Sequence, residues 1–164
     1  MAVEIERKYL VWEVPADLER YGRNPISQGY LAIEEGGTEV RVRRLGYAAY
    51  LTAKSGHGRA REEQEIEITV QQFERMWPLT EGRRVEKTRY ELPVSDGLTA
   101  ELDVYHGELT GLVTAEIEFP DAAAADRFIA PGWFGPEVTE DDRYKNRRLA
   151  TDGLPRSGEV PEKG

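Results

Sequence analysis

Cysteine is absent from this 164-residue chain, and histidine occurs only twice. The lack of cysteine excludes a disulfide framework, a thiolate zinc site and a cysteine nucleophile. Long apolar runs are also missing: no segment approaches the roughly 18 residues that a membrane-spanning helix needs, and the first residues lack the basic and apolar regions of a signal peptide. We therefore expect a cytoplasmic protein. The length predicts one domain, residues 1–150, followed by a disordered C-terminal tail, residues 151–164.

An excess of positive charge is missing as well. The chain carries 22 basic and 31 acidic side chains, which give a formal net charge of −9. Such a charge argues against nonspecific attraction to nucleic acid or to an anionic membrane. Basic residues nevertheless gather locally, in "RVRR" (residues 41–44) and "GRRVEKTRY" (residues 82–90). Any polyanionic ligand must therefore be held by local charge.

The dominant pattern in the chain is an alternation of polar and apolar residues with a period of two, broken by glycine, proline and aspartate, which predicts strands separated by turns. Short connections between them favour antiparallel neighbours. Eight strands are expected, near residues 3–11, 27–34, 38–45, 48–55, 62–69, 84–92, 98–106 and 113–119.

Three further segments have helical rather than strand spacing. The first, residues 69–79, repeats apolar residues at helical intervals and is stopped by Pro78. The second, residues 121–131, starts with an aspartate that can cap its first turn. The third, residues 139–150, starts with Thr139 and carries acidic residues before basic ones, as the helix dipole favours. The apolar residues of the first two, which are Phe73, Met76, Trp77, Phe128 and Ile129, need an apolar surface to cover.

One face of nearly every predicted strand is charged. For any single strand, an antiparallel sheet with one solvated face explains this pattern. The helices favour another arrangement: if the strands close into a barrel with the helices packed outside, the charged face lines the interior. We therefore expect a mainly-β α+β fold, an eight-stranded antiparallel closed β-barrel around a polar tunnel. Burying bases and carboxylates together suits a polyanion bound with a divalent metal such as Mg²⁺ or Mn²⁺.

Taken in chain order, these residues resemble one known family. The first strand reads "EIERKYLV" (residues 4–11), which is similar to the ExExK signature of the CYTH superfamily, the triphosphate tunnel metalloenzymes. The resemblance covers residues 1–150 and is strongest to small bacterial enzymes that hydrolyse inorganic triphosphate. The other matching segments are "QGYL" (28–31), "RVR" (41–43), "LTAK" (51–54), "REEQEIEI" (61–68), "EGRRVEKTRY" (81–90), "ELDVY" (101–105), "AEIEF" (115–119) and "VTEDDRYKN" (138–146).

The resemblance implies a triphosphate tunnel domain and a role for each matching charged residue. Lys8, Tyr30, Glu4 and Glu6 are the implied catalytic residues, with Lys8 beside the reacting phosphoryl group. Tyr30 either orients Lys8 by a hydrogen bond or is a packing residue. The implied substrate-binding residues are Lys8, Arg41, Arg43, Lys54, Arg61, Lys87, Arg89 and Lys145. The implied ligands of Mg²⁺ or Mn²⁺ are Glu4, Glu6, Glu63, Glu65, Asp103, Glu116 and Glu118.

The function that follows is metal-dependent hydrolysis of inorganic triphosphate to pyrophosphate and phosphate. A class IV adenylyl cyclase, a nucleoside triphosphatase and a thiamine triphosphatase stay open, because a tunnel for three phosphates suits each of them. A noncatalytic polyphosphate-binding module is a further alternative, but such a module gains nothing from carboxylates without metal. The expected partner is a small polyanionic substrate, with no nucleic acid and no membrane, and the chain is expected to be a monomer or a homodimer.

Overall fold

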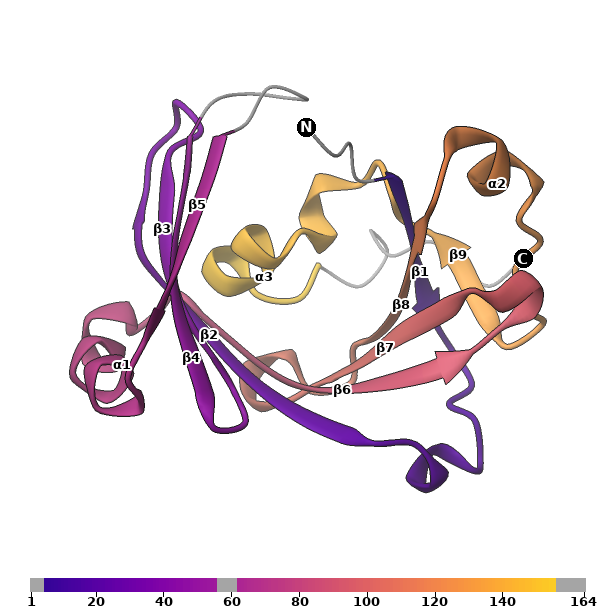
Figure 1. Ribbon diagram of the computed structural model, residues 1–164, viewed down its shortest axis with the longest axis horizontal. Helices are drawn as coiled ribbons and strands as arrows, with labels where there is room; N and C mark the ends of the chain where they lie inside the picture. The colour runs from indigo at the N-terminus through magenta and orange to yellow at the C-terminus, as the bar shows by residue number, and fades with distance from the viewer. Residues whose placement is uncertain (1–4, 56–61, 156–164) are drawn as a thin grey trace.

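The computed structural model describes residues 5–55 and 62–155. Within them, antiparallel strands form one sheet in the order β5-β4-β3-β2-β6-β7-β8-β1-β9. The sheet curves into a trough with a concave and a convex side (Figure 1). The strands are β1 (Ile5–Val11), β2 (Arg23–Ile33), β3 (Glu39–Leu45), β4 (Ala48–Ser55), β5 (Glu62–Ile68), β6 (Arg84–Pro93), β7 (Thr99–Tyr105), β8 (Val113–Phe119) and β9 (Phe134–Glu137).

The mainly-β α+β fold is confirmed, and β1 to β8 correspond to the eight predicted strands. The predicted number of strands is wrong, because the described residues already form a sheet of nine. The ninth strand, β9, reads "FGPE" and contains both a glycine and a proline. Glycine and proline are poor strand formers, and four residues are too few to display an alternation. Only its pairing with β1 identifies this segment as a strand.

The predicted closure of the sheet is not found in the part of the chain that the structure describes. β5 and β9 stand at opposite ends of the strand order, and no described strand pair joins them. The edge of β1 that a closed eight-stranded barrel would use is occupied instead by β9, through the pairs Tyr9 with Glu137 and Val11 with Phe134. The sheet is therefore an open trough.

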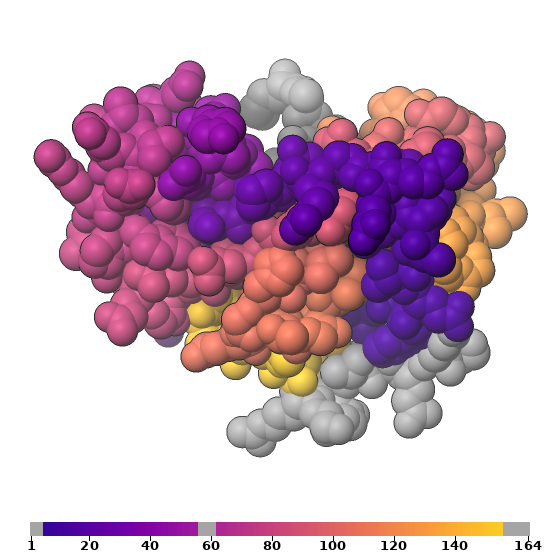
Figure 2. Space-filling model, turned by 90° about the horizontal axis from the view of Figure 1, so that it is seen from below, coloured from indigo at the N-terminus to yellow at the C-terminus, as the bar shows by residue number. Residues whose placement is uncertain are grey.

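Two helices pack on the convex side, as predicted. Helix α1 (Val70–Met76) places Phe73 against Val42 and Ala49 of the sheet. Helix α2 (Ala122–Arg127) is followed by Phe128, whose ring lies 5.4 Å from that of Phe119. Figure 2 views the convex side, with the magenta segment around α1 at one end of the molecule and the indigo N-terminal residues at the other. The apolar strand faces are thus covered from outside.

The last helix differs from the prediction in both extent and place. Residues after β9 form a 3-10 turn, η6 (Asp142–Tyr144), and only then does α3 (Asn146–Asp152) begin. Helix α3 lies inside the trough (Figure 1), not outside it. Its apolar side chains, with Tyr144, cover the apolar residues at one end of the concave face, which are Leu10, Tyr30, Val85 and Tyr105. Burial of this small apolar patch explains why the segment turns inward.

Helix α3 continues past residue 150 into the predicted tail, and residues 156–164 of that tail lie outside the described residues. In the part of the chain that the structure describes, every helix is too short and too polar to cross a lipid bilayer.

Candidate active site

Strand register brings the charged positions predicted from the sequence onto one face of the sheet, because directly paired residues in antiparallel strands share a face. This is the concave face. Glu4 and Arg61 lie outside the described residues, so the structure gives no position for them. The direct pairs are Lys8 with Glu116, Glu6 with Glu118, Arg41 with Thr52, Lys54 with Glu63, and Arg89 with Asp103.

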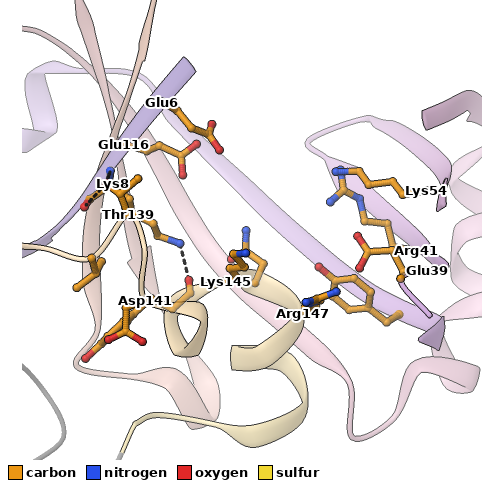
Figure 3. Close-up of a pocket in the computed structure, with 15 residues that line it drawn as sticks. Glu6, Lys8, Glu39, Arg41, Lys54, Glu116, Thr139, Asp141, Lys145 and Arg147 are labelled. Atoms are coloured by element: carbon orange, nitrogen blue, oxygen red, sulfur yellow. Dashed lines mark hydrogen bonds between the residues drawn. The ribbon is translucent and has the colours of Figure 1, made fainter. Parts of the chain in front are cut away.

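A cavity of about 360 Å³ lies between this face and the segment that contains η6 and α3. Figure 3 shows the carboxylates of Glu6 and Glu116 on one side of the cavity and the cations Arg41 and Lys54 on the other. The volume is that of a small-ligand site. The predicted site residues that line the cavity are Glu6, Lys8, Tyr30, Arg41, Lys54, Glu116 and Lys145.

The carboxylates of Glu6, Glu116 and Glu118 on β1 and β8 form an acidic wall, of which Glu6 and Glu116 line the cavity and Glu118 lies outside its lining. Glu6 lies opposite Glu118, and Glu116 lies opposite Lys8 on one side and Glu101 on the other. Like charges directly opposite each other destabilise a sheet, so this set of oxygen donors favours a bound cation. No three acidic or histidine side chains among the described residues are arranged to hold a metal ion by themselves. Mg²⁺ often binds through one or two carboxylates plus water and phosphate oxygens, and the acidic wall fits that mode.

The basic wall is formed by Arg41 and Arg43 of β3 and Lys54 of β4, of which Arg41 and Lys54 line the cavity and Arg43 lies outside its lining. The Nε atoms of Arg41 and Arg43 are buried and have no hydrogen-bond partner among the described residues. Burial, together with the neighbouring Arg41 guanidinium, lowers the pKa of Arg43. A buried donor without an acceptor is costly, and a phosphate oxygen would satisfy it. These two arginines are therefore suited to bind an anion.

The floor of the trough carries a buried charge network centred on Asp103. The Lys87 ammonium lies 2.8 Å from Oδ2 of Asp103, and Arg89 donates to both carboxylate oxygens, at 2.8 and 3.0 Å. Arg89 also pairs with Glu101. Burial alone would raise the pKa of Asp103, but Lys87 and Arg89 outweigh it and lower the pKa to about 2. Asp103, predicted as a metal ligand, thus has two cations as neighbours.

The two glutamates of β5 lie beside groups of β4. Glu65 accepts a hydrogen bond from the Thr52 hydroxyl at 2.8 Å, and Glu63 lies 3.9 Å from the Lys54 ammonium. Neither of them lines the cavity that Glu6 and Glu116 share, whose lining stops at Lys54 on this side. The structure therefore separates the carboxylates of β5 from those of Glu6 and Glu116.

Lys8 and Tyr30 both line the cavity, and their hydrogen bonds lead to different groups. The Lys8 ammonium donates to the Tyr144 carbonyl at 2.6 Å. The Tyr30 hydroxyl accepts from the Gln28 amide at 2.9 Å, and burial raises the pKa of this phenol. The role of Tyr30 in orienting Lys8 stays a prediction.

Several cavity residues were missed by the sequence reasoning. Glu39 alternates with Arg41 and Arg43, so strand period alone could have placed it on the same face. Arg147 belongs to the basic run of the last helix, but its place in the cavity depends on α3 turning inward. Thr139 is the first residue of the third predicted helix, whereas in the structure its hydroxyl accepts from the Lys8 backbone N–H. Only the tertiary structure reveals the last two.

Comparison with known proteins finds relatives that match nearly the whole chain. The chain is 52% identical over 147 residues to the inorganic triphosphatase of Nitrosomonas europaea, which covers 90% of this chain and 96% of that protein. It is 39% identical over 153 residues to the inorganic triphosphatase of Acetivibrio thermocellus, covering 91% and 94%. No family model matches the chain.

Solved structures agree with the sequence relatives. The crystal structure of an inorganic triphosphatase superposes with a TM-score of 0.78 at 48% identity, over 92% of this chain and 96% of that one. A Hippeastrum protein described as an adenylyl cyclase with a dominant triphosphatase activity has a TM-score of 0.53 at 16% identity, over 75% and 82%. That second likeness concerns the fold alone. From the identity to its curated relatives, this chain belongs to the inorganic triphosphatase family.

Proposed function

We propose that this protein hydrolyses inorganic triphosphate to pyrophosphate and phosphate in the concave-face cavity. The observation that carries the proposal is the pairing of an acidic wall on β1 and β8 with a basic wall on β3 and β4 across one cavity. A triphosphate is a compact polyanion that needs both cationic side chains and a metal to offset its charge. Membership of the inorganic triphosphatase family supports the same substrate.

Glu6, Glu116 and Glu118 are the described residues that would hold Mg²⁺ or Mn²⁺, with Glu4 as a further ligand implied by the family signature. Such an ion supplies Lewis-acid neutralisation of phosphate oxygens and a more acidic water. Carboxylate oxygens are hard donors that both ions prefer. The acidic wall is thus the proposed metal side of the cavity.

The side chains of the basic wall would bind the phosphates. The Arg41 and Arg43 guanidinium groups offer buried N–H donors, and Lys54 lies beside Arg41 in the cavity lining. Phosphoryl transfer requires little covalent chemistry from the protein. The main task is therefore to hold the triphosphate so that the attacking water and the leaving phosphate are in line, and to stabilise the charge that develops. Lys8 lies next to Glu116 in the register, which is where an ammonium could contact the phosphoryl group that reacts.

The test is phosphate release from tripolyphosphate in the presence of Mg²⁺ or Mn²⁺. We expect Glu6→Gln to lower kcat/KM by about 100-fold or more, because one charged ligand of the metal is lost. Glu81→Gln, which neutralises an exposed loop carboxylate, should match the wild type. Equal activity of wild type and Glu6→Gln would contradict the metal assignment.

A substrate panel distinguishes the alternatives that share the fold. ATP, thiamine triphosphate and tripolyphosphate should be compared under the same metal conditions. We expect tripolyphosphate to have the highest kcat/KM. Formation of cyclic AMP would instead identify a cyclase, and binding of tripolyphosphate without turnover would identify a noncatalytic module.

A closed tunnel is our proposal for the substrate-bound protein. The basic and acidic walls carry opposite charges and face one cavity, so a polyanion with its metal would draw the two sides of the trough together. Because the chain has no cysteine, a double variant with Gln64→Cys and Asp126→Cys takes up spin labels at these two positions and nowhere else. We expect their distance to shorten when tripolyphosphate and Mg²⁺ are added. An unchanged distance would reject closure.

A further inference from the structure

The segment that follows β9 is attached to Lys8 at three points. The Val138 N–H donates to the Lys8 carbonyl at 2.8 Å, and the Lys8 N–H donates to Oγ1 of Thr139 at 3.0 Å. The Lys8 ammonium donates to the Tyr144 carbonyl at 2.6 Å. One short segment therefore holds both the backbone and the side chain of Lys8.

The Thr139 hydroxyl takes the place of a strand partner. β9 ends at Glu137, which pairs with Tyr9, so the strand supplies no carbonyl opposite Lys8. The hydroxyl donates its single proton to Oε2 of Glu137 at 2.6 Å and accepts from the Lys8 N–H. Since an ionised carboxylate can only accept, the direction of both hydrogen bonds is determined. The position of Lys8 thus depends on that of Glu137.

Glu137 is in turn held from the convex side of β1. Arg7 donates to both of its carboxylate oxygens, at 3.0 and 2.6 Å, and to the Ala125 carbonyl of α2 at 2.8 Å. The hydrogen bonds from Arg7 lower the pKa of Glu137, which keeps it ionised at neutral pH. A continuous set of contacts therefore runs from α2 through Arg7, Glu137 and Thr139 to Lys8.

From this geometry we infer that Thr139 is a positioning residue for Lys8, and that its hydroxyl sets where the Lys8 ammonium meets the substrate. The inference rests on the proposed function, in which that ammonium contacts the reacting phosphoryl group. Misplacement of a contributing group by about 1 Å can lower a rate about 100-fold. A hydroxyl that holds the Lys8 backbone is therefore expected to affect turnover.

The first experiment compares Thr139→Val, which removes the hydroxyl, with Thr139→Ser, which retains it. We expect Thr139→Val to lower kcat for tripolyphosphate by about 10-fold to 100-fold while KM changes by less than about threefold. Thr139→Ser should stay within about threefold of the wild type. The matched control is Thr110→Val, because the Thr110 hydroxyl donates to the Gly107 carbonyl of an exposed turn. Wild-type kcat for Thr139→Val would overturn the inference.

A double-mutant cycle with Lys8→Ala separates positioning from general stabilisation. If Thr139 acts through Lys8, Thr139→Val should cause no further loss of kcat in the Lys8→Ala background. If Thr139 only stabilises the fold, the same factor should be lost in both backgrounds, and this result would overturn the inference.

An NMR measurement tests the contact without depending on catalysis. The amide signal of Lys8 should shift in Thr139→Val and stay near its wild-type position in Thr139→Ser, since only the serine can still accept its hydrogen bond. An unshifted Lys8 signal in Thr139→Val would overturn the inference. If wild-type protein fails to release phosphate while the Lys8 signal responds as expected, the proposed function fails and the contact between Thr139 and Lys8 stands.

Discussion

Asp103 illustrates how neighbours decide what a carboxylate does. It is 4% exposed, and Lys87 and Arg89 occupy both of its oxygens. Removing one partner of a buried ion pair leaves uncompensated charge and costs about 3 kcal/mol or more. We expect Asp103→Asn to lower the free energy of unfolding by this amount, measured by urea denaturation at pH 7. Glu108→Gln, which neutralises an exposed carboxylate, is the control and should change stability little.

The lowered pKa of Asp103 also makes the stability of the protein depend on pH. The pKa of Asp103 is about 2 in the folded protein, against about 3.9 in an unfolded chain. Because the folded pKa is the lower one, the stabilisation of about 2 kcal/mol is complete above about pH 4 and is lost as pH falls through about 2. The difference in unfolding free energy between wild type and Asp103→Asn should therefore shrink across that interval. A difference that is constant from pH 5 to 2 would contradict this assignment.

At the scale of single residues, the sequence predicts faces well and contacts poorly. Period-two alternation correctly places Lys8, Arg41 and Glu116 on one charged face, because strand geometry alone determines it. It cannot distinguish a carboxylate that meets two cations, as Asp103 does, from one that faces other carboxylates. That distinction depends on which strands become neighbours.

Gly29 links β2 to the outer layer of the molecule. A Cβ atom at this position would lie 2.5 Å from Oγ1 of Thr80, in the 3-10 turn η3 (Trp77–Thr80). Thr80 cannot easily move away, because its hydroxyl donates to the Trp77 carbonyl and accepts from Arg84. We expect Gly29→Ala to reduce the free energy of unfolding by about 2 kcal/mol, measured by urea denaturation.

Gly22 provides the control for that variant. A Cβ atom there meets nothing within 4 Å, so Gly22→Ala should be neutral or slightly stabilising through the unfolded chain. Equal stability of the two alanine variants would show that β2 and the turn can separate without cost.

At the scale of whole elements, long regular segments are predictable and the last ones are not. β1 to β8 and α1 follow from alternation, turn residues and capping, as in the capping box of Thr69 and Gln72. α3 has the composition of an ordinary surface helix, and its inward turn depends on Tyr144 and Leu149 meeting an apolar patch assembled from four strands. Such a long-range packing contact has no local signal.

At the scale of the whole molecule, the sheet ends at β5, an edge strand that carries many carboxylates. β5 pairs with β4 on one side, and no described strand covers its other side. Charged residues on an edge strand prevent it from pairing with another copy. We expect the double variant Glu62→Thr and Glu67→Thr to self-associate as concentration rises, measured by light scattering after gel filtration.

A variant with the same change in net charge isolates the role of the edge. Glu81→Thr with Glu108→Thr alters two exposed positions outside the strands instead, and it should keep the molecular mass of the wild type. Identical masses for both double variants would mean that the edge carboxylates do not limit association.

The hydrogen bond between the Lys8 ammonium and the Tyr144 carbonyl joins residues 136 positions apart. A ribosome adds Tyr144 136 residues after Lys8, and the strands between them can fold in the meantime. A nascent chain, or one cut short by a premature stop codon before Tyr144, can therefore contain the whole of β1 to β8 and still lack one side of its cavity. Translation itself thus delays activity until Tyr144 has been added.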